Sequence, residues 1–308
     1  MAEPRYSFTA FTPTFNRAHT LGRVYESLCS QTYTDFEWLI VDDGSTDDTP
    51  QLVAGWQADA PFEIRYLRQP NQGKHSAFNH GVREARGKLF LTLDSDDAIA
   101  PQALERFWHH WQAIPKPKRD GFAAVTALCL DQEGKVVGDL FPRDILDSNS
   151  SELKHRYKVR GEKWGFTRTD LLRVHPYPEL PGVRFVPESV VWIPISSRYQ
   201  TRFVNEPLRI YHTSAGDQLS QAGLRRDHLK GLALWHQTVL NYEAGWFWRD
   251  PFDLLRSGAN YARFSFLSGW SFKEQAKHLT GTAARLLWLA GLLPGWLKAR
   301  TDRSRLID

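Results

Sequence analysis

The first hundred residues of the chain alternate between short apolar runs and longer segments whose apolar residues recur at helical spacing. One such segment, residues 20–31, has apolar side chains every three or four positions, which is the pattern of an amphipathic helix. The whole pattern predicts strands at residues 6–12, 37–41, 62–67 and 88–93, and helices at residues 20–31, 49–56, 75–85 and 100–111. Because short links join strands and helices in turn, we expect a layered α/β fold with a mainly parallel sheet and right-handed crossovers.

A polar segment follows each of the four predicted strands. These segments are residues 12–17, 42–47, 69–75 and 94–97. In parallel α/β sheets, ligands bind beyond the carboxyl ends of the strands. We therefore expect the four segments to meet at one edge of the sheet and to form a binding site there.

The segment after the fourth strand carries two carboxylates, Asp94 and Asp96, on either side of Ser95. On a tight turn, carboxylates at this spacing can face one hard cation, and Mg²⁺ or Mn²⁺ prefers such oxygen ligands while keeping positions open for phosphate. A cation there would neutralise a diphosphate leaving group. The structural alternative is that Asp97 only caps a helix starting at the next residue.

The other three segments each allow a functional and a structural interpretation. Asp42 and Asp43 can bind a base or a ribose, or they can form a turn and a helix cap. Residues 12–17 can contact a nucleotide or serve as a capping segment. Gly73 lets the backbone approach a ligand closely, and Lys74 places a positive charge at a helix N-terminus, where it does not help the helix.

From residue 122 the strict alternation ends. Two apolar runs, residues 123–130 and 136–141, flank a polar turn and predict a hairpin. Residues 142–158 are polar and serine-rich and predict a mobile loop. The pattern then predicts a strand, a helix and a strand, at residues 162–166, 187–198 and 202–211. Beyond residue 212 the chain becomes helical and aromatic.

The formal net charge is +4, and residues 268–308 carry an excess of basic residues equal to all of it. The rest of the chain is balanced, which argues against a nucleic-acid-binding surface.

Cys29 and Cys129 lie in apolar stretches, so we expect two buried thiols and a reducing compartment. We also expect no signal peptide and no spanning helix, which favours a cytoplasmic location.

The basic C-terminal region contains an uncharged run, residues 286–297, with basic residues directly after it. The run is too short to cross a bilayer, which needs about 20 residues. Interfacial tryptophans, an apolar face and a cationic end are typical of a helix that lies in the plane of a membrane surface. We therefore expect peripheral attachment to the inner face of a membrane. The alternative is that these helices pack on the catalytic domain or form a dimer interface.

Taken in order, the motifs of residues 6–110 resemble the large family of inverting glycosyltransferases with the GT-A fold, often called family two. The motifs that carry the resemblance are Phe11-Thr12-Pro13-Thr14-Phe15-Asn16-Arg17, Ile40-Val41-Asp42-Asp43-Gly44-Ser45-Thr46-Asp47, Asn71-Gln72-Gly73, Asn79-His80-Gly81 and Leu93-Asp94-Ser95-Asp96-Asp97. The resemblance weakens between residues 111 and 212 and is absent beyond them. It implies a three-layer GT-A-like fold and a metal-dependent transfer.

The resemblance also implies roles for individual residues. The nucleotide-sugar site would comprise Thr12, Pro13, Asn16, Arg17, Asp42, Asp43, Lys74, Asp94 and Ser95. Asp94, Asp96 and His212 would hold Mn²⁺ or Mg²⁺, although a histidine at a strand end is also an ordinary exposed residue. Glu188 would be the catalytic base; the family often has two acids there, and here Ser189 replaces the second, so a helix-dipole role for Glu188 stays open.

The resulting hypothesis is an inverting glycosyltransferase. It would use a nucleotide-diphosphate sugar, most simply of the uridine diphosphate type, and a glycan or lipid-linked acceptor. Residues 1–212 would be the catalytic domain, with a nucleotide-binding half (1–110) and an acceptor half (111–212), and residues 213–308 a helical extension. The alternatives are a non-catalytic module that binds nucleotide-sugars or glycans, and a sugar nucleotidyltransferase, although the glycine-rich opening loop of the latter is missing.

Overall fold

The computed structural model describes residues 3–212 and 224–307, which fall into two compact units. Among the described residues, the first comprises 3–149, 157–176 and 198–212 and is called the sheet unit below. The second comprises 150–156, 177–197 and 224–307 and is called the helical unit. Two segments of the helical unit therefore lie within the part of the chain that was expected to be the catalytic domain; the functional division at residue 212 stays a prediction.

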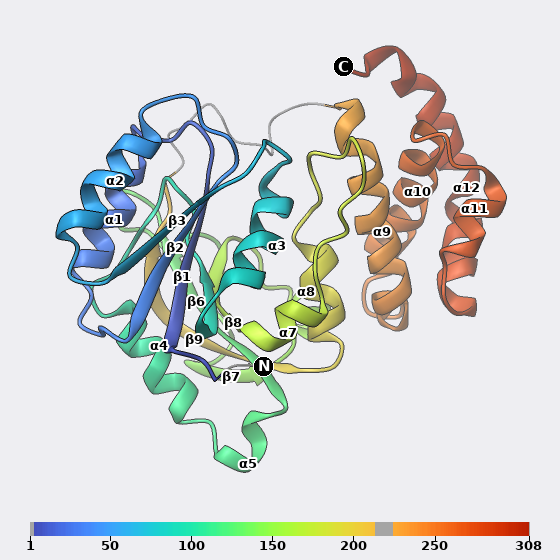
Figure 1. Ribbon diagram of the computed structural model, residues 1–308. Helices are drawn as coiled ribbons and strands as arrows, with labels where there is room; N and C mark the ends of the chain where they lie inside the picture. The colour runs from blue at the N-terminus through green and yellow to red at the C-terminus, as the bar shows by residue number, and fades with distance from the viewer. Residues whose placement is uncertain (1–2, 213–223, 308) are drawn as a thin grey trace. The chain divides into compact units, whose positions relative to one another are not determined.

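The four predicted strands form a parallel half-sheet in the order β3-β2-β1-β4 (Figure 1). Their bounds are β1 (Tyr6–Thr14), β2 (Phe36–Asp42), β3 (Glu63–Arg68) and β4 (Gly87–Thr92). Strand β2 is buried at every position and β1 at most of its positions, as expected for central strands covered on both faces. The predicted parallel arrangement is confirmed for this half.

The other half of the sheet mixes parallel and antiparallel pairs. It adds β5 (Ala98–Ile99), β6 (Phe122–Leu130), β7 (Ile145–Ser148), β8 (Lys163–Arg168) and β9 (Gln200–Ile210). Strand β8 runs antiparallel to β4 and β6, whereas β9 runs parallel to β6. The complete nine-stranded sheet is therefore mixed. A parallel neighbour needs a long crossover connection, and the regular strand–helix alternation that supplies one ends after the first four strands.

Helices cover both faces of the parallel half, which confirms the three-layer arrangement (Figure 1). One face carries α1 (Leu21–Cys29), α2 (Thr49–Asp59) and α4 (Ala103–Gln112). The other face carries α3 (Lys74–Glu84) and α7 (Thr169–Val174). The four-residue helix α5 (Lys116–Arg119) follows α4 in the chain. Side chains alternate across β1: Phe8 packs in the cluster with α1, and Phe11 contacts Phe78 of α3. Cys129 is buried as expected, but Cys29, at the last position of α1, is exposed.

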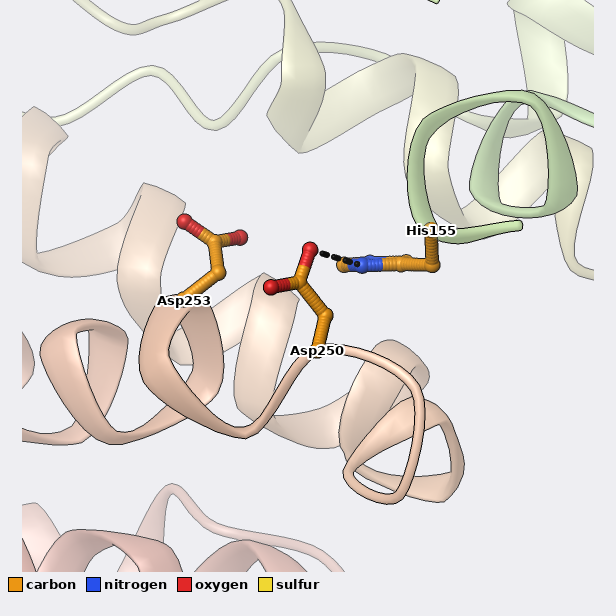
Figure 2. A group of neighbouring side chains, drawn as sticks. All are labelled: His155, Asp250 and Asp253. Atoms are coloured by element: carbon orange, nitrogen blue, oxygen red, sulfur yellow. Dashed lines mark hydrogen bonds and ion pairs between the residues drawn. The ribbon is translucent and has the colours of Figure 1, made fainter. Parts of the chain in front are cut away.

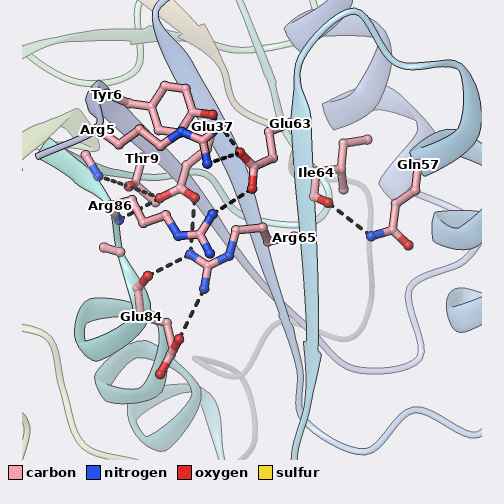
Figure 3. A network of polar contacts seen from close by, with 12 residues as sticks. Arg5, Tyr6, Thr9, Glu37, Gln57, Glu63, Ile64, Arg65, Glu84 and Arg86 are labelled. Atoms are coloured by element: carbon pink, nitrogen blue, oxygen red, sulfur yellow. Dashed lines mark hydrogen bonds and ion pairs between the residues drawn. The ribbon is translucent and has the colours of Figure 1, made fainter.

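A buried polar network ties the amino ends of the strands together, opposite the edge expected to bind ligands (Figure 3). Glu37 on β2 is fully buried. Its carboxylate accepts hydrogen bonds from the Thr9 hydroxyl (2.7 Å) and the Arg86 backbone N–H (2.7 Å), and Arg65 pairs with it at 3.2 Å. Because three donors surround the charge, it can be buried without being left unpaired.

Residues 142–158 were expected to be a mobile loop, and this is wrong. They contain β7, which pairs with β9, and the short helix α6 (Ser150–His155). The predicted hairpin is also only partly present, because Val136 makes one isolated bridge to Leu130 and no second strand follows. The strand, helix and strand predicted between residues 162 and 211 are confirmed as β8, α8 (Ser189–Ser196) and β9.

The helical unit is built on three long helices that pack side by side, α9, α10 and α12 (Figure 1). Their bounds are α9 (Leu229–Glu243), α10 (Pro251–Leu267) and α12 (Thr282–Asp302), with the short α11 (Phe272–Lys277) between the last two. Glycines set the approach of α10 and α12: a Cβ at Gly291 would lie 2.3 Å from the Ala259 nitrogen. Among residues 3–212 and 224–307, no helix has both the length and the apolar content needed to cross a membrane.

Candidate active site at the carboxyl edge of the sheet

Backbone hydrogen bonds join the four polar segments at the carboxyl edge of the parallel strands. The Asp43 N–H donates to the Thr14 carbonyl at 2.8 Å, and the Gln69 N–H donates to the Asp42 carbonyl at 2.9 Å. The Leu93 N–H, directly before the fourth segment, donates to the Phe11 carbonyl of β1 at 2.8 Å, and Lys74 Nζ of the third segment lies 2.8 Å from the Asp94 carboxylate of the fourth. The predicted meeting of these segments at one edge is therefore confirmed.

Asp42 is completely buried, and both of its carboxylate oxygens have protein partners. One oxygen accepts the Ser45 backbone N–H at 2.7 Å, which closes the turn after β2. The other accepts the Tyr66 hydroxyl from β3, and burial together with this contact raises the pKa of Tyr66. Asp42 thus forms the turn that the structural interpretation predicted, and its contact with a donor stays a prediction.

Asp43 shapes the next segment along the edge. Its carboxylate accepts backbone N–H groups from Gln72 (2.9 Å) and Gly73 (2.7 Å), and the Gln69 side-chain amide at 2.8 Å. Gly73 has φ of +94°, a conformation that glycine adopts without strain. Asp43 therefore fixes the backbone directly before Lys74, the first residue of α3.

Residues 12–17, which form the end of β1 and the segment after it, contact β2 and the turn that follows β2. Thr12 is buried, and its hydroxyl accepts the Trp38 indole N–H at 3.0 Å; Pro13 is buried as well. Asn16 has φ of +53°, and its side-chain oxygen accepts the Thr46 N–H at 2.8 Å. The Arg17 carbonyl accepts the Thr20 N–H at 3.0 Å at the start of α1. These contacts order the segment, and the nucleotide contacts of the four residues stay predictions.

Asp94 lies between two cationic side chains from distant parts of the sheet unit. Lys74 Nζ is 2.8 Å from one carboxylate oxygen, and Arg209 Nη2, from β9, is 3.0 Å from the other. Burial by itself would raise the pKa of Asp94, but the charges of Lys74 and Arg209 outweigh it and hold that pKa well below its usual value. The pairing brings the predicted residues Lys74 and Asp94 together, and Asp94 is ionised at neutral pH.

Asp97 and Arg209 form a buried ion pair beside Asp94. Arg209 Nε donates to Asp97 at 2.8 Å, and the His212 backbone N–H donates to the other oxygen at 2.8 Å. Burial raises the pKa of Asp97 to about 6, although Arg209 opposes the shift. The capping alternative for Asp97 is wrong, because Ala98 and Ile99 form β5 and α4 begins only at Ala103.

Asp96 differs from its two neighbours. It is half-buried, and its backbone carbonyl accepts Arg23 Nη1 at 3.2 Å. Within residues 3–212 and 224–307, no hydrogen bond or ion pair engages its carboxylate. Ser95 is buried, and the His212 ring Nδ1 lies 4.0 Å from Asp97. The Asp96 carboxylate therefore fits the role of a cation ligand, and the metal roles of Asp94 and His212 stay predictions.

Another group in the helical unit was not anticipated from the sequence (Figure 2). Ligand atoms of His155, Asp250 and Asp253 lie within 4.8 Å of one another, and no other set of three such residues is so close in the described parts of the chain. However, Lys154 Nζ lies 2.8 Å from Asp253, and the other ring nitrogen of His155 lies 3.2 Å from Glu243. Lys154 and His155 therefore already contact these acids, and the contacts tie α6 to α9 and α10.

Glu188, the predicted base, lies directly before α8 at its N-cap position and is exposed. Its carbonyl accepts the Val191 N–H at 2.9 Å, as in any first helical turn. Glu188 belongs to the helical unit, whereas Asp94, Asp96 and His212 belong to the sheet unit. Its catalytic role stays a prediction.

A mixed sheet with helices on both faces and an acidic cluster beyond β4 defines the GT-A class of glycosyltransferase folds. The solved structure of Staphylococcus aureus TarS 1–349 in complex with UDP-GlcNAc has a TM-score of 0.66 and 16% identity, covering 97% of this chain and 92% of that one. A mannosyltransferase from Pyrobaculum calidifontis, in complex with GDP-Man and Mn²⁺, has a TM-score of 0.50 and 19% identity, covering 98% and 90%. These likenesses concern the fold.

Residues 9–126 match the model of glycosyl transferase family 2, the family that the motifs of residues 6–110 resemble. An uncharacterized glycosyltransferase of Nostoc sp. is 33% identical over 139 residues, which is 45% of this chain and 37% of the relative. A GalNAc(5)-diNAcBac-PP-undecaprenol beta-1,3-glucosyltransferase of Campylobacter jejuni is 25% identical over 217 residues, 69% of this chain and 66% of the relative. The similarity thus spans less than two thirds of both relatives.

Proposed function

We propose that this chain is an inverting glycosyltransferase that moves a sugar from a nucleotide-diphosphate sugar to an acceptor hydroxyl. The observation that carries the proposal is the cluster of Lys74, Asp94 and Asp96 at the carboxyl edge of the sheet, within the region that matches the family. Lys74 and Arg209 fix the Asp94 carboxylate, while the Asp96 carboxylate has no protein partner among the described residues. A carboxylate left open in this way can hold a cation that neutralises a departing diphosphate, which favours a transferase.

We further propose that Asp96, with Asp94 and His212, holds Mn²⁺ or Mg²⁺. Such a cation, when bound, neutralises charge on the departing diphosphate. The mannosyltransferase from Pyrobaculum calidifontis was solved in complex with Mn²⁺, which supports the same requirement here. Lys74 would add a second positive charge on the same side of the leaving group, since its ammonium group lies 2.8 Å from Asp94.

In the proposed reaction, the acceptor oxygen forms a bond to the anomeric carbon as the bond to the diphosphate oxygen breaks. The diphosphate leaves with the electron pair, and Glu188 takes the proton of the acceptor hydroxyl. One displacement inverts the anomeric centre. The assignment of Glu188 rests on the family resemblance and on its exposed position, from which it can exchange a proton.

The donor and the acceptor are proposed by class. Proteins of similar fold have been solved in complex with UDP-GlcNAc and with GDP-Man, and we propose a uridine diphosphate sugar for this chain. The Campylobacter relative is named for an undecaprenol-linked acceptor, which supports a glycan or lipid-linked acceptor in polysaccharide, glycolipid or cell-envelope synthesis. An enzyme with such an acceptor would work in the cytoplasm, at the inner face of the membrane.

The test is release of nucleoside diphosphate from a panel of nucleotide-sugars, with Mn²⁺, with Mg²⁺ and with a chelator. We expect metal-dependent release with at least one donor, and a loss of roughly 10²-fold or more in Asp96→Asn, since the cation acts mainly on the transition state. Glu133→Gln removes a carboxylate from an exposed turn and serves as the matched control.

Two measurements with the same nucleotides separate the proposal from its alternatives: calorimetry for binding and product assays for turnover. Binding of a donor without any turnover would favour the non-catalytic module. Formation of a nucleotide-sugar from a nucleoside triphosphate and a sugar phosphate would favour the nucleotidyltransferase. Turnover that is insensitive both to the chelator and to Asp96→Asn would exclude Asp96 as a metal ligand.

A further inference from the structure

Helix α12 carries a continuous apolar stripe on its exposed side. Its large members are 40% to 65% exposed, and they are Leu286, Leu289, Leu293, Trp296 and Leu297. They recur every three, four or seven positions, which places them on one face of the helix. Between the first and the last of them, a helix rises about 17 Å at ~1.5 Å per residue. Large apolar patches of this kind on a folded surface mark interaction sites.

The opposite side of α12 already supplies the core of the helical unit. Leu287 and Trp288 are buried in a cluster with Leu254 and Tyr261 of α10. Gly291 and Gly295 let the two helices approach closely on that side. Packing on the helical unit therefore accounts for one face of α12 and leaves the stripe without an explanation.

Basic side chains stand at both ends of the stripe. Arg285 precedes it, and Lys298 and Arg300 follow, with two further arginines in the next turn. The sequence has no aspartate or glutamate between residues 275 and 301. The Arg300 guanidinium lies 4.8 Å from the centre of the Trp296 ring, so an aromatic and a cation occupy the same end of the stripe. In the part of the chain that the structure describes, Lys298 alone of these three is neutralised, by Asp302 at 3.2 Å.

We infer that the stripe of α12 is a docking face for an anionic lipid surface. The leucines would enter the boundary between headgroups and acyl chains, Trp296 would lie at the headgroup level, and the arginines would contact lipid phosphates. A second copy of the chain fits this face poorly. Any pairing of two such stripes brings basic ends together, because the sequence between residues 275 and 301 offers no acidic partner and the nearby Asp302 already pairs with Lys298 at 3.2 Å.

This inference deepens the proposed function, since it names the surface by which the enzyme would reach a lipid-linked acceptor. Its test does not depend on sugar transfer. The full chain is floated with vesicles of phosphatidylcholine containing phosphatidylglycerol, and with vesicles of phosphatidylcholine alone. We expect clear preference for the anionic vesicles, and a fall of about tenfold or more in partitioning for Leu289→Glu/Leu293→Glu, because two apolar insertions are lost.

Two further variants serve as a control for the apolar substitutions and as a separate test of the basic residues. Leu140→Glu changes an equally exposed leucine in the sheet unit and should bind vesicles like the wild type. Arg300→Gln/Arg303→Gln leaves the stripe intact and should weaken binding to anionic vesicles only. Circular dichroism checks that each variant is folded, and donor turnover without vesicles should be unchanged in all three.

The inference is overturned if the folded Leu289→Glu/Leu293→Glu variant floats as the wild type does, or if the wild type binds neither kind of vesicle. It is also overturned if light scattering shows a wild-type dimer that this variant converts to a monomer, since the stripe would then be an interface between copies. If the wild type binds anionic vesicles but turns over no donor, that result contradicts the proposed function and leaves the docking face standing.

Discussion

At the scale of single residues, the candidate site depends on one arginine that no motif contains. Arg209 contacts Asp94 and Asp97 from β9, more than a hundred positions later in the sequence. With Lys74, it gives Asp94 a fixed place and a low pKa, and it leaves Asp96 as the carboxylate open to a cation. Asp94, Asp96 and Asp97 are the same residue type within four positions of the sequence. Their roles differ in the fold because each has different partners.

The prediction at this scale concerns Glu188→Gln. The change keeps the size of the side chain and removes its ability to accept a proton. We expect the rate of sugar transfer to fall by roughly 10²–10⁴-fold, while the dissociation constant for the donor stays the same. Single-turnover transfer assays and calorimetry measure the two quantities.

Glu179→Gln is a suitable control, since it alters another acid of the same segment before α8. If Glu188→Gln transfers sugar at a near-normal rate, the base lies elsewhere. If donor affinity falls together with the rate, Glu188 contributes to binding and the change does not report on proton transfer.

At the scale of elements, polar contacts connect the strands of the parallel half of the sheet at both their carboxyl and their amino ends. At the carboxyl edge, Asp42 and Asp43 hold the segments that follow the strands. At the amino edge, buried Glu37 connects Thr9, Arg65 and Arg86 (Figure 3). These polar contacts fix the strand ends in register, while apolar packing holds the helices against the sheet.

We predict that Glu37→Ala lowers the free energy of unfolding by about 3 kcal/mol or more, because it leaves buried donors and the Arg65 charge without their partner. Glu63→Ala removes a half-exposed acid of the same network, which pairs with Arg86 at 2.7 Å. This control should cost at most about 1 kcal/mol. Urea denaturation of both variants measures the difference, and equal losses would show that burial of Glu37 is not the decisive feature.

At the scale of the whole molecule, the two units interleave along the chain. Helices α6 and α8 belong to the helical unit, although sheet strands precede and follow them in the sequence. Ile193 of α8 packs in a cluster with Val239 and Leu240 of α9, and Ser151 of α6 donates to Glu243 at 2.7 Å. The helical unit is therefore completed by segments that lie before residue 212.

It follows that a chain truncated after residue 212 should not behave as an independent domain. Helix α8 would lose the apolar partners of Ile193, and the polar side chains of α6 would lose theirs. We expect such a chain to aggregate and to bind more of a hydrophobic dye than the full chain does. Size-exclusion chromatography and dye fluorescence measure this; a monodisperse fragment with a cooperative melting transition would contradict the prediction.

The sequence by itself determined the parallel half of the sheet and the place of the site. Strand and helix periodicities are local signals, and parallel strands bring their carboxyl ends together whatever follows. The acidic segments after β2 and β4 could therefore be placed at one edge. The short helix α6 was missed, because a six-residue polar helix is stabilised by contacts with α9 and α10 rather than by its own pattern.

Only the tertiary structure decided what each site residue contacts. Three of the aspartates bind other groups of the protein. Asp42 accepts a hydrogen bond from Tyr66, Asp43 from the Gln72 N–H and Asp97 from Arg209, and these partners lie on other strands and loops. It also decided that the apolar run at residues 286–297 is half core and half surface, which composition cannot distinguish. Long-range pairing and burial depend on which elements become neighbours, and that information is spread over the whole chain.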